Sequence, residues 1–176
     1  GSFGVDGLVT YFMSEQFTAT ESMIGRYGAL RGIGAVIGAV VGGLLIDRLG
    51  RRQSAYSAVV LISVVAVLIG AATGSAVVIW LGLAWGVIWA FQETVFFALA
   101  MDIADARIAA SMFAVMMAIS NLGAALADGA ATALSDNLGF VAVFFALAAI
   151  NLVTLPVLWG LFRVAPEIAT RSPSSD

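Results

Sequence analysis

Long apolar runs separated by short polar turns are the feature that most limits how this chain can fold. A transmembrane helix needs about 20 apolar residues. Helices of about this length are predicted at 21–46, 54–72, 76–101, 107–134 and 140–164. A shorter run at 3–13 predicts the end of a further helix whose beginning is missing. The predicted fold class is therefore an all-α membrane protein, a bundle of about six transmembrane helices with the first one truncated.

This bundle is predicted to occupy residues 1–164 and to lie in a lipid bilayer, and the polar residues 165–176 are predicted to form a disordered tail. Pro156 is expected to kink the last helix, because proline cannot donate a helical N–H. Gly34, Gly38 and Gly42 recur every four residues on one helix face. Small residues at this spacing allow helices to pack closely in lipid, so we expect a tight helix contact there.

The composition agrees with a membrane protein and excludes several functional classes. Of the 176 residues 61% are hydrophobic and 11% are charged, whereas a soluble domain carries about 25% charged residues. The chain has no Cys and no His, which removes thiol chemistry and the commonest metal ligand. It also has no nucleophile elbow and no Walker loop. We therefore expect no enzyme activity, no cofactor, no metal site and no nucleic-acid partner.

The strongly basic turn Gly43–Arg52 reads G-L-L-I-D-R-L-G-R-R and joins two apolar runs. Gly50 can adopt a positive φ, which lets the backbone reverse within a few residues. Alternating spans place most arginines on the side of this turn: Arg48, Arg51, Arg52, Arg107, Arg163 and Arg171. The opposite turns carry only Arg26. The positive-inside rule therefore predicts a multi-pass protein, of the plasma or inner membrane, with this turn and the tail in the cytoplasm.

The spacing G-x-x-x-D-R-x-G-R-R resembles the signature loop of the major facilitator superfamily of transporters. The resemblance implies one six-helix half of a secondary transporter, which moves a small solute by alternating access and is proton-coupled in some members. It also implies a partner, either the missing other half or a second copy. The truncated first helix and the absent Met favour the C-terminal half. The order of Glu93, Asp102 and Asn121 is loosely similar to the branch that contains muropeptide and acetyl-CoA permeases.

The resemblance further implies that polar groups around the signature loop form a conformational gate. The candidate gate residues are Gly43, Asp47, Arg48, Gly50, Arg51, Arg52, Asp102 and Asp105. Asp47 is expected to accept hydrogen bonds at the start of the helix at 107–134, and the arginines are expected to pair with Asp102 and Asp105, with Asp105 also the expected N-cap of that helix. The alternative is that the arginines only set the topology.

Ionisable residues inside the apolar runs are candidates for solute or proton contacts, because a charge in hydrocarbon is costly. Arg31 could hold an anionic group of a solute with its planar guanidinium, or could form a structural ion pair. Asp6 belongs to a helix that lines the cavity in the similar family, so it could contact the solute too.

Trp85, Trp89 and Glu93 recur every four residues on one helix face, with Gln92 beside them. This face predicts a cavity wall in which Glu93 carries a proton or pairs with the solute and Gln92 donates a hydrogen bond. The alternative is a satisfied glutamate packed against structural tryptophans. Asn121 lies in the middle of its helix and is a further candidate for solute or proton contacts, although a helix–helix hydrogen bond is the favoured interpretation.

Two functions from different classes remain open after this reading. The first is part of a secondary active transporter for a small solute. The alternative is a non-transporting half-length membrane module that acts through self-association or partner binding. The reading frame upstream of Gly1 distinguishes the two: six further spans there would favour a full transporter, and a Met shortly upstream would favour a standalone half.

Overall fold

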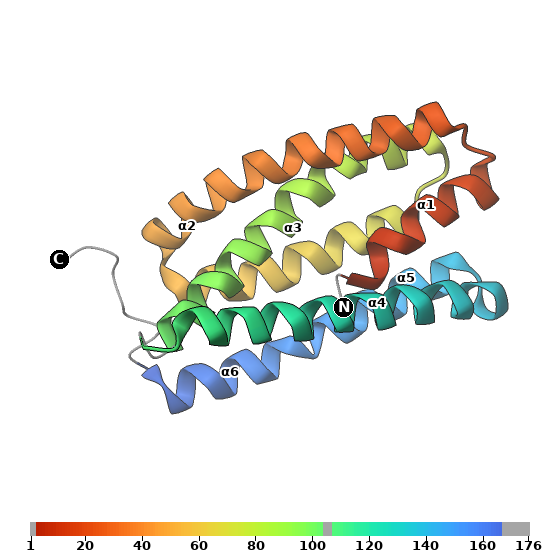
Figure 1. Cartoon of the computed structure of the whole chain (residues 1–176). Helices are drawn as coiled ribbons and strands as arrows, with labels where there is room; N and C mark the ends of the chain where they lie inside the picture. Colours follow the sequence, from red (N-terminus) through yellow and green to blue (C-terminus); the bar gives the residue numbers. More distant parts are fainter. Residues whose placement is uncertain (1–2, 104–106, 167–176) are drawn as a thin grey trace.

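The computed structural model describes residues 3–103 and 107–166, and within them all regular secondary structure is helical. The helices are α1 (Phe3–Phe17), α2 (Glu21–Gly70), α3 (Ser75–Ile103), α4 (Ala109–Leu138), α5 (Phe140–Leu152) and α6 (Thr154–Val164) (Figure 1). The predicted tail lies almost entirely outside the described residues. The all-α class is confirmed.

Gly50 divides α2 into two arms that run in opposite directions (Figure 1). Its φ of 78° and ψ of 161° are not helical. A positive φ is accessible to glycine without the steric cost that a Cβ atom imposes. The two helices predicted on either side of the basic turn are therefore the two arms of α2, and the predicted role of Gly50 in reversing the chain is confirmed.

The predicted count of about six transmembrane helices is not confirmed. Within the described residues, four helical segments are long and apolar enough to cross a membrane: Glu21–Gly70, Ser75–Asp102, Ala109–Leu138 and Phe140–Val164. The difference has two causes. The two arms of α2 count as one helix of 50 residues, and α1 has only 15 residues, which is below the length that a bilayer requires.

The last span is interrupted at Val153, between α5 and α6. The Val153 N–H donates to the carbonyl of Ile150 at 3.1 Å, a tight turn of the 3₁₀ type. Pro156, three residues later, lacks the N–H that would donate to the Leu152 carbonyl. The kink predicted from Pro156 is thus present as a short break in the helix.

The breaks and turns gather at two opposite ends of the molecule. The Gly50 reversal, the end of α3, the start of α4 and the end of α6 share one end, and the α1–α2, α2–α3 and α4–α5 connections share the other (Figure 1). The α1–α2 turn differs in detail from a capping box, because Thr20 is the N-cap of α2 and makes no side-chain capping hydrogen bond.

A stripe of glycines holds the first arm of α2 against α3. A Cβ atom added to Gly34 or Gly38 would collide with backbone atoms of Leu83 or Val87. In the reverse direction, a Cβ atom on Gly86 would collide with the Arg31 carbonyl. The two backbones can approach this closely only because these positions lack side chains. The tight contact predicted from the glycine spacing is confirmed.

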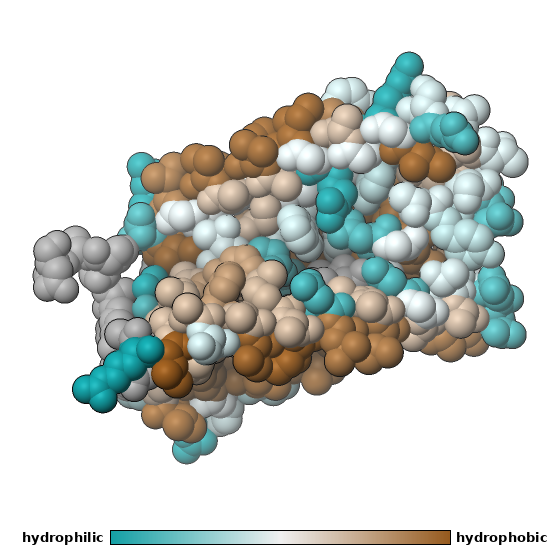
Figure 2. All heavy atoms as spheres, in the orientation of Figure 1, coloured by the Kyte–Doolittle hydropathy of each residue, from teal (hydrophilic) through white to brown (hydrophobic). Residues whose placement is uncertain are grey.

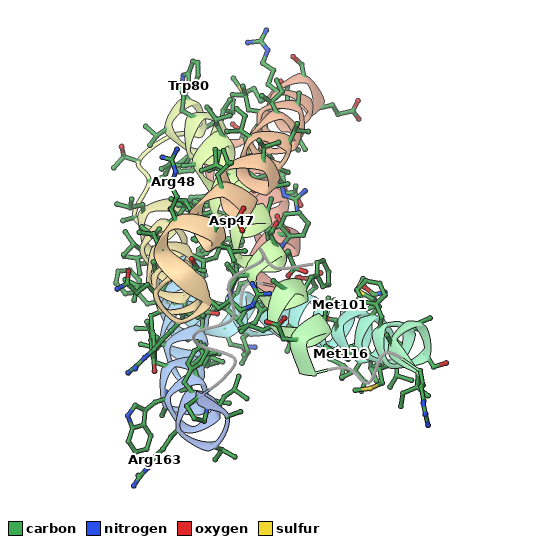
Figure 3. The ribbon with its side chains drawn as sticks, turned by 90° about the vertical axis from the view of Figure 1, so that its left-hand side faces the viewer. Asp47, Arg48, Trp80, Met101, Met116 and Arg163 are labelled. Carbon is green, nitrogen blue, oxygen red and sulfur yellow. The ribbon has the colours of Figure 1, made fainter. Side chains whose placement is uncertain are left out.

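Helix α4 stands to one side of the other helices, as the end-on view of Figure 3 shows near the labelled Met116. It packs mainly against α1 and only slightly against α3. Gly7 of α1 is the close contact, since a Cβ atom there would lie 3.1 Å from Asp128. The outward faces of the molecule expose large apolar side chains such as Val40, Leu126 and Val157, as a surface in contact with lipid does.

We predict that Gly38→Ala destabilises the protein by about 1–3 kcal/mol, because the new methyl group must push α2 and α3 apart. The measurement is the thermal unfolding midpoint in detergent. Gly32→Ala on the same helix is the matched control, because nothing lies within 4 Å of a Cβ atom added there. Equal midpoints for the two variants would contradict the close contact.

Candidate functional site

Four of the predicted site residues form one polar cluster between α1, α2 and α3. Arg31 donates two hydrogen bonds to Asp6, from Nε to Oδ1 at 2.7 Å and from Nη2 to Oδ2 at 2.5 Å. The indole N–H of Trp85 donates to Asp6 Oδ1 at 2.9 Å. The guanidinium carbon of Arg31 lies 4.8 Å from the ring centre of Trp89. The sequence analysis placed these four residues on three different helices, and the fold brings them together.

The ion pair changes what Arg31 can do. The Asp6 carboxylate already binds its planar guanidinium group, so in this conformation Arg31 forms the structural ion pair that was the alternative to solute binding. The pair is not fully buried, because the side chains of Arg31 and Asp6 keep 28% and 27% of their surface exposed. The cluster therefore presents both a positive and a negative group whose charges sum to zero.

A groove of about 720 Å³ runs between α2, α3 and α4. Its lining residues are Ala35, Val36, Ala39, Trp89, Ala90, Glu93, Thr94, Phe97, Met117, Ser120 and Asn121. Figure 2 shows this face, where apolar masses above and below flank a hollow that contains hydrophilic residues. The groove is mostly apolar, with a few polar groups, which is the usual character of a small-molecule site.

Glu93 also borders a second cavity, here called the side pocket, of about 190 Å³. The side pocket lies between α3, α4 and the junction of α5 with α6. Its lining residues are Gln92, Glu93, Phe96, Phe97, Phe113, Met116, Met117, Ser120, Asn151 and Thr154. Glu93 thus forms part of the wall of both spaces. Neither lining contains a basic residue.

Several buried polar atoms have no hydrogen-bond partner within the part of the chain that the structure describes. These are Tyr27 Oη, Trp89 Nε1, Gln92 Oε1 and Asp128 Oδ1. A buried polar atom left unpaired costs on the order of 1–3 kcal/mol. Two of the four, on Trp89 and Gln92, belong to residues that border the groove or the side pocket. This supports a site that a polar ligand completes.

Asn121 differs from its prediction. It is exposed on α4 and lines the groove, and no helix–helix hydrogen bond of its side chain is found among the described residues. The reason is the position of α4, which stands away from α3 along the groove. The mid-span asparagine was expected to need a partner helix, but this side of α4 faces a hollow.

The sequence analysis missed two polar residues near the site. Asn151 is buried and donates from Nδ2 to Val59 O at 3.0 Å and to Ser63 Oγ at 2.9 Å. Asp128 packs against Gly7. Asn151 could have been found, because it is the one amide within the most apolar run and lies five residues before Pro156.

At the end of the molecule that carries the basic turn, Arg51 pairs with Asp102. Arg51 donates from Nε to Asp102 Oδ2 and from Nη2 to Asp102 Oδ1, the latter at 2.9 Å. The side chains are only 14% and 11% exposed. The hydrogen bond to Asp102 raises the pKa of Arg51 above its ordinary value. The pair joins the middle of α2 to the end of α3.

The other gate candidates contribute less in this conformation. Asp47, Arg48 and Arg52 are exposed, and the described residues include no ion pair partner for them; Asp47 and Arg48 are labelled in Figure 3. The described residues include no hydrogen bond from the start of α4 to Asp47; the N-cap of α4 is Ile108, without a side-chain capping hydrogen bond. A Cβ atom on Gly43 would meet nothing within 4 Å. Asp105 lies outside the described residues, and α4 begins later than its predicted cap position.

Nothing in the described residues resembles a conventional metal centre, since no three His, Cys, Asp or Glu side chains gather there. No curated protein and no solved structure matches the chain significantly. The family model for the Major Facilitator Superfamily matches residues 1–176. Its members are transporters of small solutes rather than enzymes. Together with the apolar helices and the groove, this match shows that the chain is an integral, multi-pass membrane protein that belongs to the major facilitator superfamily.

Proposed function

We propose that this chain is one half of a secondary active transporter, which moves a small solute across a membrane by alternating access. The groove is the observation that supports this most strongly. It brings Glu93, Ser120 and Asn121 into a hollow between helices whose outward faces are apolar. Polar groups inside a membrane bundle usually mark a solute or ion pathway. A non-transporting module is not better supported, because such a module needs no polar groove.

The groove is open along one side (Figure 2), so a complete pathway needs a second wall. We propose that the other half of the transporter, or a second copy of this chain, supplies it. The glycine contact makes α2 and α3 one rigid unit. Rocking of such units around a fixed site is how transporters built from structural repeats alternate access. The assignments to the C-terminal half and to the muropeptide and acetyl-CoA permease branch stay predictions from the sequence.

For the orientation we propose that the end with the Gly50 reversal faces the cytoplasm of a plasma or inner membrane. Arg48, Arg51, Arg52 and Arg163 belong to elements that end there, and Arg26 belongs to the opposite half of its helix. The positive-inside rule supports this choice. The Arg51–Asp102 pair then acts as a cytoplasmic lock, which must break when the pathway opens on that side.

The polar cluster and Glu93 have separate roles in this proposal. A zwitterionic solute suits the Asp6–Arg31 pair best. Its negative group can pair with Arg31 and its positive group with Asp6, so neither side chain is left buried and unpaired. Trp85, Trp89, Gln92 and Asn121 supply stacking surface and hydrogen bonds around it. Glu93 is the coupling group. An ionised carboxylate between apolar helices is costly unless a cation or water contacts it. A proton is the simplest cation that neutralises it.

We predict that Glu93→Gln reduces concentrative uptake at least tenfold while preserving exchange of solute, because the amide cannot take up and release a proton. The measurement uses proteoliposomes that contain the protein from its full reading frame and a panel of radiolabelled amino acids and dipeptides as zwitterionic probes. Glu21→Gln makes the same change on a residue that lines neither the groove nor the side pocket and is the control. Uptake driven by a pH gradient at wild-type rate in Glu93→Gln would contradict the coupling role.

We predict that Arg31→Gln and Asp6→Asn each destabilise the protein by about 3–5 kcal/mol, because each leaves a partly buried charge unpaired. The double variant should recover most of this loss in the thermal unfolding midpoint. Uptake of the same probes separates the two roles of the pair. A double variant that is stable and fully active would show that the pair is structural and would remove it from the solute site.

We predict that Arg51→Ala shifts the population toward the cytoplasm-open state about tenfold, as expected when a hydrogen-bonded ion pair of 1–3 kcal/mol is lost. The chain has no Cys, so a single cysteine introduced as Val36→Cys in the groove reports access from each side by its labelling rate. Arg52→Ala is the control. The exchange of charges in Arg51→Asp with Asp102→Arg should restore the original rate; faster labelling there would argue against a lock.

A further inference from the structure

The side pocket holds many oxygen atoms and no basic group. Glu93 contributes a carboxylate, Gln92 and Asn151 contribute amide oxygens, and Ser120 and Thr154 contribute hydroxyl oxygens. These five side chains come from α3, α4, α5 and α6, and the other lining residues are Phe and Met. All five polar side chains of the lining can offer an oxygen acceptor, and the only charged side chain among them is the negative Glu93 carboxylate. Such a site attracts a cation rather than an anion.

Gln92 gives an independent sign that a ligand is needed there. The residue is 3% exposed, and its Oε1 atom has no hydrogen-bond partner among the described residues. A buried amide oxygen is stabilised when it accepts a hydrogen bond or coordinates a cation. The neighbouring Glu93 carboxylate cannot donate to it when ionised. A cation between the two would satisfy both groups at once.

The orientation of Asn151 adds a second acceptor. Its Nδ2 atom uses both hydrogens, one toward Val59 O and one toward Ser63 Oγ. Ser63 in turn donates to Val59 O at 2.9 Å, so its oxygen is the acceptor for Asn151. These bonds fix the amide so that the nitrogen faces the second arm of α2. The Oδ1 atom is left on the other side as an acceptor in a residue that lines the side pocket.

The helix break at Val153 borders the same space, because Asn151 and Thr154 stand on either side of it and both line the pocket. Pro156 removes the N–H that would bind the Leu152 carbonyl. Thr154 opens α6, and no hydrogen bond of its hydroxyl is found among the described residues. Interrupted helices with exposed carbonyls and hydroxyls are a recurring way for membrane transporters to coordinate Na⁺.

Charge and size narrow the choice of cation. Divalent Ca²⁺ and Mg²⁺ sites are built around carboxylates together with carbonyls and waters, and the side pocket offers one carboxylate among four neutral side chains. One negative charge is balanced by one monovalent ion. The volume of about 190 Å³ has room for a small ion with a few waters, since a water occupies about 30 Å³ in the liquid.

We propose that the side pocket is a sodium site, in which Na⁺ is bound by the Glu93 carboxylate and the oxygens of Gln92, Ser120, Asn151 and Thr154. Because Glu93 also borders the groove, Na⁺ in the side pocket neutralises the carboxylate that faces the solute. Sodium and a proton therefore compete for one group. The binding of Na⁺ stands on the pocket alone, and its use in coupling rests on the proposed function.

The test measures ion binding without any solute. The protein from its full reading frame, in detergent micelles, is titrated with NaCl, KCl or choline chloride over the same range of ionic strength, and the thermal unfolding midpoint is recorded. We expect a saturable rise with Na⁺, since a ligand that binds only the folded state stabilises it, and a weaker rise at acidic pH as protons occupy Glu93. Equal rises in NaCl and choline chloride would reduce the effect to ionic strength and overturn the proposal. A larger rise with K⁺ would overturn the assignment to sodium.

Three variants locate the site, and a fourth provides a matched control. Glu93→Gln, Gln92→Met and Thr154→Val should each raise the half-saturating Na⁺ concentration about tenfold or more, which corresponds to the loss of one coordinating group. Thr94→Val makes the same change as Thr154→Val, on a residue that lines the groove but not the side pocket, and should keep the wild-type response. Wild-type Na⁺ response in all three site variants would overturn the proposal even if each folds.

The outcomes for the ion and for the solute are separable. A specific Na⁺ response in a protein that accumulates none of the zwitterionic probes would contradict the proposed function and leave the ion site standing. Probe uptake without any specific Na⁺ response would remove the ion site and leave the transporter standing.

Discussion

The backbone contact between the first arm of α2 and α3 is the interaction on which the candidate site depends. Gly34 and Gly38 of α2 and Gly86 of α3 lie directly against the backbone of the facing helix. Gly86 meets the carbonyl of Arg31 itself, so the glycine stripe sets the height of Arg31 relative to Trp85 and Trp89 on α3. A side chain at any of these positions would separate the helices and weaken both the ion pair and the stacking of Arg31. In lipid, where burial of apolar groups gives little drive for helix association, such close packing is a main source of stability.

The polar groups are distributed so that the apolar bundle tolerates them. Asp6 neutralises Arg31 and also accepts a hydrogen bond from Trp85, so this cluster is almost fully satisfied without a ligand. Among the residues that the structure describes, Glu93 has no such partner, and it lies where the groove and the side pocket meet. The Arg51–Asp102 pair sits at the end of the bundle, away from both cavities. The three groups of charges are therefore spatially separate.

The signals that could be predicted from the sequence are those that depend on local pattern. Apolar length predicted the helices, the glycine spacing predicted the α2–α3 contact, and Gly50 predicted the reversal. The pairing of Asp6 with Arg31 could not be predicted, because it depends on how a 15-residue α1 docks against α2 and α3. The same holds for Asn121, whose surroundings follow from α4 standing apart. The N-terminus of α4 was misplaced because no capping side chain marks it.

The shared wall of the two cavities has a thermodynamic consequence. Met117 and Ser120 of α4 line both the groove and the side pocket, while α4 has few contacts with α3. A displacement of α4 therefore alters both volumes together and leaves the α2–α3 unit intact. Occupants of the two spaces that prefer the same position of α4 strengthen each other's binding by an equal factor, and occupants that prefer different positions weaken each other equally. One helix that lines two neighbouring sites is enough to make them interdependent.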